Sequence, residues 1–340
     1  PWYKENYTAY DSTVALRGLQ FFPTIVIDES NKNTYFTSTG DALGDNYQYV
    51  VLSEDITLST NNYLKLKSQK DGTSYPTTYF SKQTFDGDSL TITITTEPKF
   101  KGLFELDHSF VKNLNLNANP QTLSCDSYCG WIARSGSSGE ITYSSSNGNI
   151  GTHAGGIAGS KCVDIEIKDC YSTGDIGDYG GGIIGDSCTV YSNDMVKIKN
   201  SYSTGSIGKY AGGIAGAYAG TNVQNTYNNM YSIGCIIQKS YSSGDIGEYG
   251  GGIVGAYGGE GFFYLAGTFG DINSQIKLGE LTIEKSFSRG KISSSAGGIL
   301  GAYAGLVYKN KNEFGLKIKA TNGITTNGIN VEYCYAIGDM

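Results

Sequence analysis

The stretch Ile167–Gly185, IKDCYSTGDIGDYGGGIIG, decides the fold because it returns along the chain in nearly the same form. Close copies are Ile198–Gly216, IKNSYSTGSIGKYAGGIAG, and Ile237–Gly255, IQKSYSSGDIGEYGGGIVG. Weaker copies occupy Ile141–Gly159 and Ile283–Gly301, and a sixth begins at Val331. Self-similarity with a period of a few tens of residues is the signature of a repeat architecture, in which each copy is one structural unit.

Two isoleucines keep a spacing of seven residues within every copy, and they define two columns of predicted core residues. One column is Ile157, Ile183, Ile214, Ile253 and Ile299, and the other is Ile176, Ile207, Ile246 and Ile292, preceded by Ile150. Successive members of the first column are 26, 31, 39 and 46 residues apart, so all length variation falls between copies. A rigid coil that tolerates insertions on one side is typical of a solenoid.

The residues that open each copy alternate between apolar and polar side chains. Ile165 and Ile167 flank Glu166, and Val196 and Ile198 flank Lys197. A period of two predicts strands with one face inward, and equivalent strands of successive copies should then stack at about 4.8 Å. We therefore predict an all-β fold, a right-handed single-stranded parallel β-helix, or β-solenoid, with an irregular N-terminal cap.

Composition and turn residues agree with this fold. Glycine accounts for 48 residues, proline for 5 and tyrosine for 27, which suits tight corners between strands and excludes a collagen-like chain. Triplets such as Gly180-Gly181-Gly182 recur in each copy and require either positive φ or close backbone contact at a corner. A phosphate-binding loop would need a helix after the glycines, and no helical pattern follows them.

Three regions follow from the repeat. Residues 1–45 are predicted to form an N-terminal cap or assembly segment, and residues 46–138 to form degenerate coils with strands such as Leu90–Thr95. Residues 139–340 form the regular repeats, continuous with the preceding coils, and loops of variable length should begin after Gly185, Gly216, Gly255 and Gly301.

The phrases GGIAG, GGIIG, GGIVG and GGILG resemble the GLUG motif of large secreted bacterial surface proteins. CYSTGDIG and GAYAG are similar to repeats in algal and giant-virus surface proteins. The resemblance covers roughly residues 139–340 and implies an exported β-helical protein with an adhesive or structural role, located outside the cell or on its surface.

Charge and hydropathy exclude two classes of partner. The formal net charge of −7, with no basic stripe, argues against nucleic-acid binding. No apolar run reaches the 18 or so residues that a membrane-spanning helix needs, so no membrane span is predicted.

The repeats contain few of the side chains that a catalytic site needs, and no cofactor or metal is predicted. A β-helix that degrades polysaccharides would need carboxylates gathered in one groove. The column Asn149, Asp175, Ser206, Asp245 and Lys291 contains no adjacent acids, and the column Asp178, Lys209 and Glu248 alternates in sign. His108 and His153 lie on different copies and are interpreted as surface or edge residues, too few for a metal site or a Ser-His-Asp arrangement.

Several other side chains stand out. Tyr171, Tyr202, Tyr241, Phe287 and Tyr335 form a predicted aromatic ladder, which either binds sugar or protein or is a covered stack. Of the seven cysteines, Cys125 and Cys129 are either a local disulfide or two free thiols, and Cys162 and Cys188 could bridge consecutive copies. Cys170 and Cys334 share a column of small residues with Ser144, Ser201, Ser240 and Ser286. Asn6 lies in the only glycosylation sequon.

The functional expectation is a non-enzymatic extracellular structural or adhesive protein that displays variable loops on a rigid β-helix, and a self-assembling surface filament subunit is one form that it would take. Met340 falls inside a repeat, so either the native chain continues or another subunit supplies the missing strand by end-to-end association. The expected partners are thus further copies of the chain, a cell surface or a glycan. The alternative is a carbohydrate-binding or polysaccharide-degrading β-helix, and a groove with clustered carboxylates would favour it.

Overall fold

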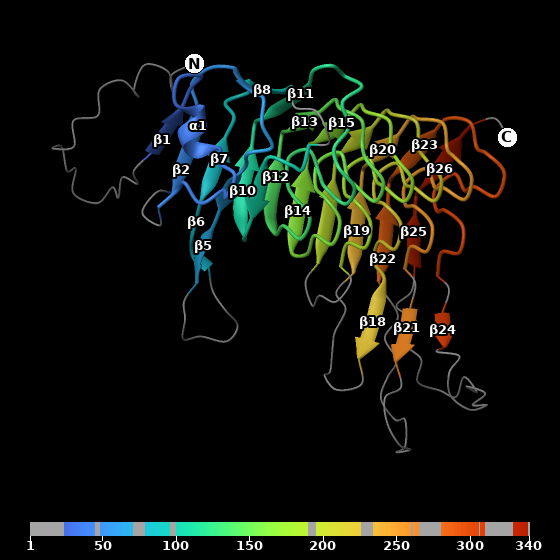
Figure 1. Ribbon diagram of the computed structural model, residues 1–340. Coiled ribbons are helices and arrows are strands. Elements are labelled where there is room, and N and C mark those ends of the chain that lie inside the picture. The colour runs from blue at the N-terminus through green and yellow to red at the C-terminus, as the bar shows by residue number, and fades with distance from the viewer. Residues whose placement is uncertain are drawn as a thin grey trace.

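The computed structural model is almost entirely β-structure arranged in long parallel sheets (Figure 1). It describes residues 24–44, 48–70, 79–95, 100–189, 195–225, 234–259, 261–264, 280–305, 307–309 and 329–338. Among these residues the only α-helix is the four-residue α1 (Lys32–Tyr35).

The longest sheet has ten strands, and every pair of neighbours in it is parallel. In spatial order the strands are β1 (Thr24–Ile27), β2 (Tyr49–Leu52), β7 (Thr84–Asp86), β10 (Ser109–Lys112), β12 (Gly139–Thr142), β14 (Ile165–Lys168), β16 (Val196–Lys199), β19 (Cys235–Gln238), β22 (Leu281–Glu284) and β25 (Ile329–Glu332). Spatial order follows chain order, which is what stacked coils require.

A second parallel sheet has nine strands and follows the first along the molecule (Figure 1). Its strands, taken in chain order, are β3 (Ile56–Leu58), β8 (Thr91–Ile94), β11 (Asn115–Ala118), β13 (Ser145–Ser146), β15 (Tyr171–Ser172), β17 (Tyr202–Ser203), β20 (Tyr241–Ser242), β23 (Phe287–Arg289) and β26 (Tyr335–Ile337). We use the word coil for the chain from one strand of the ten-stranded sheet to the next.

Smaller pairings complete the described fold. A parallel pair is formed by β4 (Leu64–Leu66) and β9 (Phe104–Leu106), and an antiparallel pair by β5 (Ser68–Lys70) and β6 (Tyr79–Lys82). A three-stranded parallel sheet of β18 (Asn222–Asn225), β21 (Gly261–Tyr264) and β24 (Val307–Lys309) projects from one side of the body (Figure 1).

The remainder of each coil is also held in register with its neighbours by single parallel bridges. Ile176 bridges Ile150 and Ile207, and Gly181 bridges Gly155 and Gly212. In the GGIxG segment the amide of Ile183 donates to the carbonyl of Ile214 over 2.9 Å, and the equivalent bond repeats in the following coils. A parallel-sheet architecture of the β-helix or solenoid kind is therefore what the repeat encodes.

The coils begin earlier than the sequence predicted. β1 lies within the region expected to be an irregular cap, yet it pairs in register with β2 and buries Ile25 and Ile27 while Thr24 and Val26 face outward. Its alternation of two is the same pattern that marks the later strands. The expected cap and assembly segment thus contains a strand of the main sheet, and residues 1–23 lie outside the described residues.

The coils also continue further than predicted after each GGIxG segment. Residues 217–220 and 256–259 still pair between coils, since the amide of Tyr218 donates to the carbonyl of Ala256 and that of Gly259 to Ala219. The chain then enters β18 and β21, which pair with each other. The insertions after Gly216, Gly255 and Gly301 therefore start about four residues later than the expected positions, and each contributes one strand to a three-stranded sheet.

The interior changes character along the molecule. Near the N-terminal end Phe85 packs against Phe104 with ring centroids 4.7 Å apart, and both contact Phe36. In the regular coils the interior is made of isoleucine columns and small residues, including fully buried Ser201 and Ser240. Identical small residues stack well at one strand spacing, whereas the earlier coils fill irregular space with rings.

The glycine triplets are needed for close contact and not for positive φ. A Cβ on Gly181 would lie 2.0 Å from the carbonyl oxygen of Ile184, and one on Gly182 would lie 2.1 Å from that of Gly213. The positive φ at this corner belongs to the residue before the triplet, which is Tyr179 with a φ of 60°. Of the two explanations predicted for the triplets, positive φ is wrong and close backbone contact is confirmed.

Candidate functional site

Seven of the nine predicted core isoleucines are buried. Ile157, Ile183, Ile214 and Ile253 are wholly buried, and Ile176, Ile207 and Ile246 are at most 4% exposed. Ile292 and Ile299 are only partly buried because they belong to the last full coil, where described residues cover them on one side. These columns build the scaffold and carry no reactive group.

The predicted aromatic ladder is present on the nine-stranded sheet. The rings of Tyr171, Tyr202, Tyr241, Phe287 and Tyr335 stack with centroids 4.8–5.2 Å apart and planes within 4° of parallel. Tyr171 is 36% exposed and Tyr335 50%, so the ladder lies on the surface. Tyr202, Tyr241 and Phe287 each have a neighbouring ring on both faces, so within the ladder only ring edges are available to a ligand.

Two further ladders were missed by the sequence analysis. One contains Tyr128, His153, Tyr179, Tyr210 and Tyr249, with centroids 4.7–5.0 Å apart, and the other contains Tyr218, Tyr257 and Tyr303. Each ring follows from a repeated position, the residue before the triplet or the tyrosine of the GAY phrase. All eight residues have positive φ, a backbone strain that ring stacking offsets.

His153 is not an ordinary edge residue. Its Nδ1 lies 2.8 Å from Oδ2 of Asp186, and its ring stacks between Tyr128 and Tyr179. Asp186 is 5% exposed, its Oδ1 has no hydrogen-bond partner among the described residues, and burial raises the pKa of its carboxyl despite the imidazole beside it. The pair is a buried polar contact between coils.

The structure holds all seven cysteines as free thiols. Neither the Cys125–Cys129 bond nor the Cys162–Cys188 bond considered from the sequence is formed in it. Burial raises the pKa of Cys125 and of Cys162 to about 12. Cys188 hydrogen-bonds instead to Cys235, and this contact together with burial raises the pKa of Cys235. Sequence spacing pointed to the same corner of consecutive coils but could not reveal Cys235, which arrives from an opening strand.

The two acidic columns are structural. Oδ1 of Asp175 accepts the amide of Ser206 over 2.9 Å, and Oδ1 of Asp245 accepts the amide of Lys291 over 2.9 Å. In the second column Lys209 Nζ lies 2.9 Å from Glu248, which lowers the pKa of that carboxyl. These side chains join neighbouring coils, which is the cross-coil pairing expected from the alternating signs.

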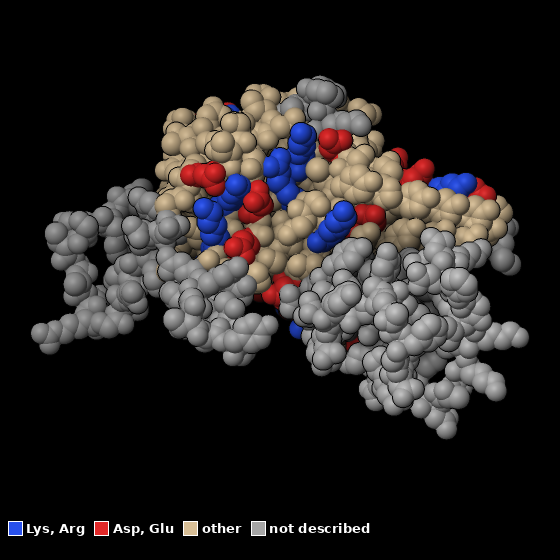
Figure 2. Space-filling model, turned by 60° about the horizontal axis from the view of Figure 1, so that its bottom comes forward, with Lys and Arg blue, Asp and Glu red and all other residues tan. Residues whose placement is uncertain are grey.

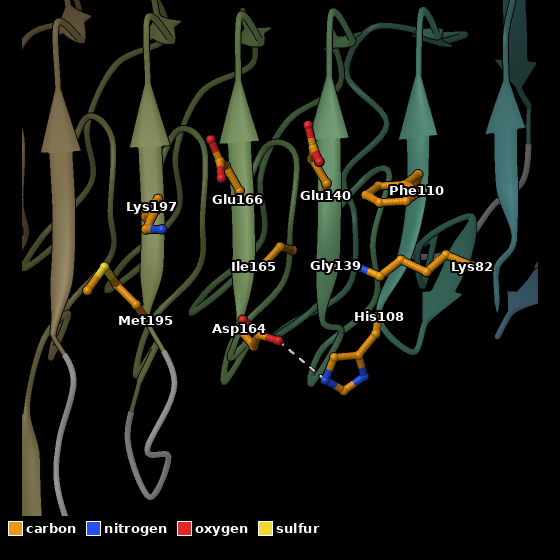
Figure 3. A pocket seen from close by; sticks show the side chains of 10 residues that line it. All are labelled: Lys82, His108, Phe110, Gly139, Glu140, Asp164, Ile165, Glu166, Met195 and Lys197. Carbon is orange, nitrogen blue, oxygen red and sulfur yellow. Dashed lines mark ion pairs between the residues drawn. The ribbon is translucent and has the colours of Figure 1, made fainter. Parts of the chain in front are cut away.

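A candidate site lies elsewhere, on the outer face of the ten-stranded sheet, where the sequence analysis had not looked for paired acids. The register places Tyr49, Thr84, Phe110, Glu140, Glu166 and Lys197 in one outward column. Glu140 and Glu166 are therefore direct neighbours on adjacent strands, and Figure 3 shows both side chains pointing the same way. We call this surface the outer groove, because two hollows follow the column.

The first hollow of the outer groove measures about 180 Å³ and the second about 290 Å³. The first is lined by Lys82, His108, Phe110, Gly139, Glu140, Asp164, Ile165, Glu166, Met195 and Lys197. The second is lined by Tyr49, Thr84, Phe110, Val111, Lys112, Glu140 and Thr142. Phe110 and Glu140 belong to both, so the two hollows adjoin each other.

The electrostatics of the outer groove centre on Glu140. Partial burial and the neighbouring Glu166 carboxylate raise the pKa of Glu140, and Lys82 and Lys168 oppose the shift. Lys82 Nζ also lies 4.9 Å from the Phe110 ring centroid. A like-charge pair in direct register is unfavourable, and raised carboxyl pKa values gather at functional sites.

His108 closes one end of the first hollow. Its Nδ1 lies 2.6 Å from Asp107 Oδ1 and 3.3 Å from the Ser138 hydroxyl, and its Nε2 lies 3.4 Å from Asp164 Oδ2 (Figure 3). Two carboxylates fix the ring orientation, so His108 is an ordered wall of the groove and not a loose surface residue.

The glycosylation sequon, a metal site and a membrane span were also considered from the sequence. Asn6 lies outside the described residues. In the described part of the chain no three His, Cys, Asp or Glu side chains gather in a way that could hold a metal ion. The described helix is far too short and polar to cross a membrane.

No protein-family model matches the chain, and a search of curated proteins also finds no match. Among solved structures the chain is similar to one described as a "putative immunoglobulin A1 protease from Bacteroides ovatus". The identity is 18%, the TM-score 0.43, and the alignment covers 85% of this chain and 77% of that chain. A likeness at this level carries no functional argument.

Proposed function

We propose that the chain is a non-enzymatic structural or adhesive protein of the cell exterior, built as a right-handed single-stranded β-helix that presents its insertions on one side. The observation that carries the proposal is the contrast between coil and insertion. Backbone bonds such as Ile183 to Ile214 repeat with the same length from coil to coil, while the chain between coils lengthens at one corner. Right-handed crossovers are the rule for parallel strands.

The side-chain columns favour a mechanical role. Three aromatic ladders, the buried serines and the isoleucine columns each contact the equivalent residue of the next coil. Stability is then a sum of nearest-neighbour terms along one axis, which suits a stiff rod. The sequence resemblance to GLUG-type surface proteins supports the same proposal, including export.

The test is electron microscopy of native material together with a deletion. Rods or filaments whose width matches a single coil are expected, and dispersed compact particles would contradict the rod. In the purified chain, replacing residues 226–233 by a short Gly-Ser linker should leave the far-ultraviolet circular dichroism and the cooperative unfolding unchanged. Loss of folding would show that this insertion supports the coil and is not displayed by it.

Surface labelling of the native producer cells tests location separately. Antibodies raised against the chain should bind intact cells, and staining that requires permeabilised cells would overturn the extracellular proposal.

A further inference from the structure

The outer groove combines three features that the rod does not need. It is elongated, it places an aromatic ring beside paired carboxylates, and it keeps a like-charge pair in register. From Tyr49 to Lys197 the column crosses five strand steps, or about 24 Å at one strand spacing. That length suits an extended ligand and exceeds what a small molecule fills.

Charge balance sets the chemical class of the ligand. The two hollows are lined by as many basic side chains as acidic ones, namely Lys82, Lys112 and Lys197 against Glu140, Asp164 and Glu166. Figure 2 shows basic and acidic side chains interspersed on the face in view. A polyanion or polycation would meet as much repulsion as attraction, so the groove favours a neutral ligand.

Hydrogen-bonding capacity narrows the class further. Carboxylates accept and ammonium groups donate, so a row of both suits hydroxyl groups, which do both. Every strand of the groove has a partner on each side, from β2 to β16, so no strand edge is open for a peptide backbone to extend the sheet. Phe110 is partly exposed and lines both hollows, and Lys82 Nζ lies over one face of its ring, 4.9 Å from the centroid. The opposite face of the ring is the apolar platform that the groove offers.

We infer that the outer groove binds a neutral, extended oligosaccharide, with Phe110 as the platform for one sugar ring and Glu140 and Glu166 as acceptors for its hydroxyl groups. His108, fixed between Asp107 and Asp164, forms the wall at the edge of this subsite. The inference does not depend on the rod proposal, because a monomer with this face would bind as well.

Titration calorimetry of the full chain against neutral cello-, manno-, malto- and chito-oligosaccharides of four to six units tests the inference. Saturable binding of at least one of them is expected. Phe110→Ala should weaken that binding about tenfold or more, the size seen when an aromatic anchor is truncated. The double variant Glu140→Gln/Glu166→Gln should weaken it by a similar factor.

The glutamine variant also separates binding from folding. It removes a like-charge repulsion and should unfold at the same temperature as the wild type or higher. Glu284→Gln is the matched control, because Glu284 lies on the same face three strands away and accepts from Gln238 over 2.8 Å. Its binding should equal that of the wild type.

Three results would overturn the inference. They are an absence of binding to every neutral oligosaccharide at millimolar concentration, binding that the Phe110 and glutamate variants leave unchanged, and binding that Glu284→Gln weakens as much as the groove variants do. None of them bears on the microscopy, so failure of the groove and failure of the rod remain distinguishable.

Discussion

His153 Nδ1 and Asp186 Oδ2 are 2.8 Å apart, and each residue differs from those at the same position in the neighbouring coils. Tyrosines occupy the position of His153 in the neighbouring coils, at Tyr128, Tyr179 and Tyr210. The position of Asp186 is otherwise small, namely Ser160, Ala217, Ala256 and Ala302. The two columns are directly bonded, since the amide of Asp186 donates to the carbonyl of His153. We therefore interpret His153 and Asp186 as a coupled pair of departures from the repeat.

A double-mutant cycle should show this coupling. His153→Tyr installs the residue of its column but leaves Asp186 buried without its partner, which should lower the free energy of unfolding by about 3 kcal/mol. Adding Asp186→Ala removes the orphaned carboxylate and should restore most of the loss. Urea denaturation of the single and double variants measures the cycle, and additive effects would contradict the coupling.

The cost of His153→Tyr should depend on pH. Burial raises the pKa of Asp186 in the folded state above its unfolded value. Protonation of the Asp186 carboxyl therefore stabilises the folded state. This contribution to the free energy of unfolding is complete below the unfolded pKa, near 3.8, and is lost as pH rises through the folded pKa. The His153→Tyr variant should approach the stability of the His153→Tyr/Asp186→Ala double variant as pH falls toward 4, a comparison in which neither protein carries the imidazole. Thermal unfolding of both proteins between neutral pH and pH 4 checks this, and a gap that widens on acidification would refute it.

Backbone conformation should separate two aromatic ladders that look alike in sequence. Tyr210 has a φ of 59° and stacks between Tyr179 and Tyr249. Tyr210→Ala removes the ring contacts and keeps the backbone strain of a positive φ. Tyr210→Gly also removes the ring contacts but relieves about 1 kcal/mol of that strain, so the glycine variant should be more stable than the alanine variant. Tyr202 is the control, because it lies in a strand without positive φ, where glycine should be worse than alanine by about 0.5–1 kcal/mol. Equal rank orders at both sites would show that stacking alone decides.

Much of this fold follows from the sequence because identical residues must stack when a coil repeats. Equal spacing within each copy is enough to predict the isoleucine columns, the ladder from Tyr171 to Tyr335 and the cross-coil pair of Lys209 and Glu248. The same spacing does not predict the pairing register of strands whose sequences differ. Glu140 and Glu166 pair only because β12 and β14 align, and Gly139 of β12 hides the alternation that marks Ile165 of β14. The candidate site was missed for that reason.

The buried serines offer a test of the interior. Ser242 Oγ donates to the carbonyl of Gly252 over 2.5 Å, and the same bond joins Ser203 to Gly213. Ser242→Ala leaves that carbonyl without its hydroxyl donor and should cost about 1–3 kcal/mol. Gly252→Ala should be far worse, since its Cβ would lie 2.1 Å from the carbonyl oxygen of Gly298. Chemical denaturation ranks the two, and a benign Gly252→Ala would show that the corner is looser than described.

Thiol chemistry tests the interior from another direction. Burial raises the pKa of Cys125, Cys162 and Cys170 to about 12, so almost none of their thiolate exists at pH 8. Only the partly exposed Cys129 and Cys334 should react with a thiol reagent in the folded chain, and all seven should react after denaturation. Cys129→Ser should remove one reactive thiol from the folded count and leave the buried ones silent. A denatured count of five would instead reveal a disulfide in the protein, and tryptic mapping would show whether it joins Cys125 to Cys129, Cys162 to Cys188 or Cys188 to Cys235. The last of these would replace the hydrogen bond between the two thiols by a covalent link between coils.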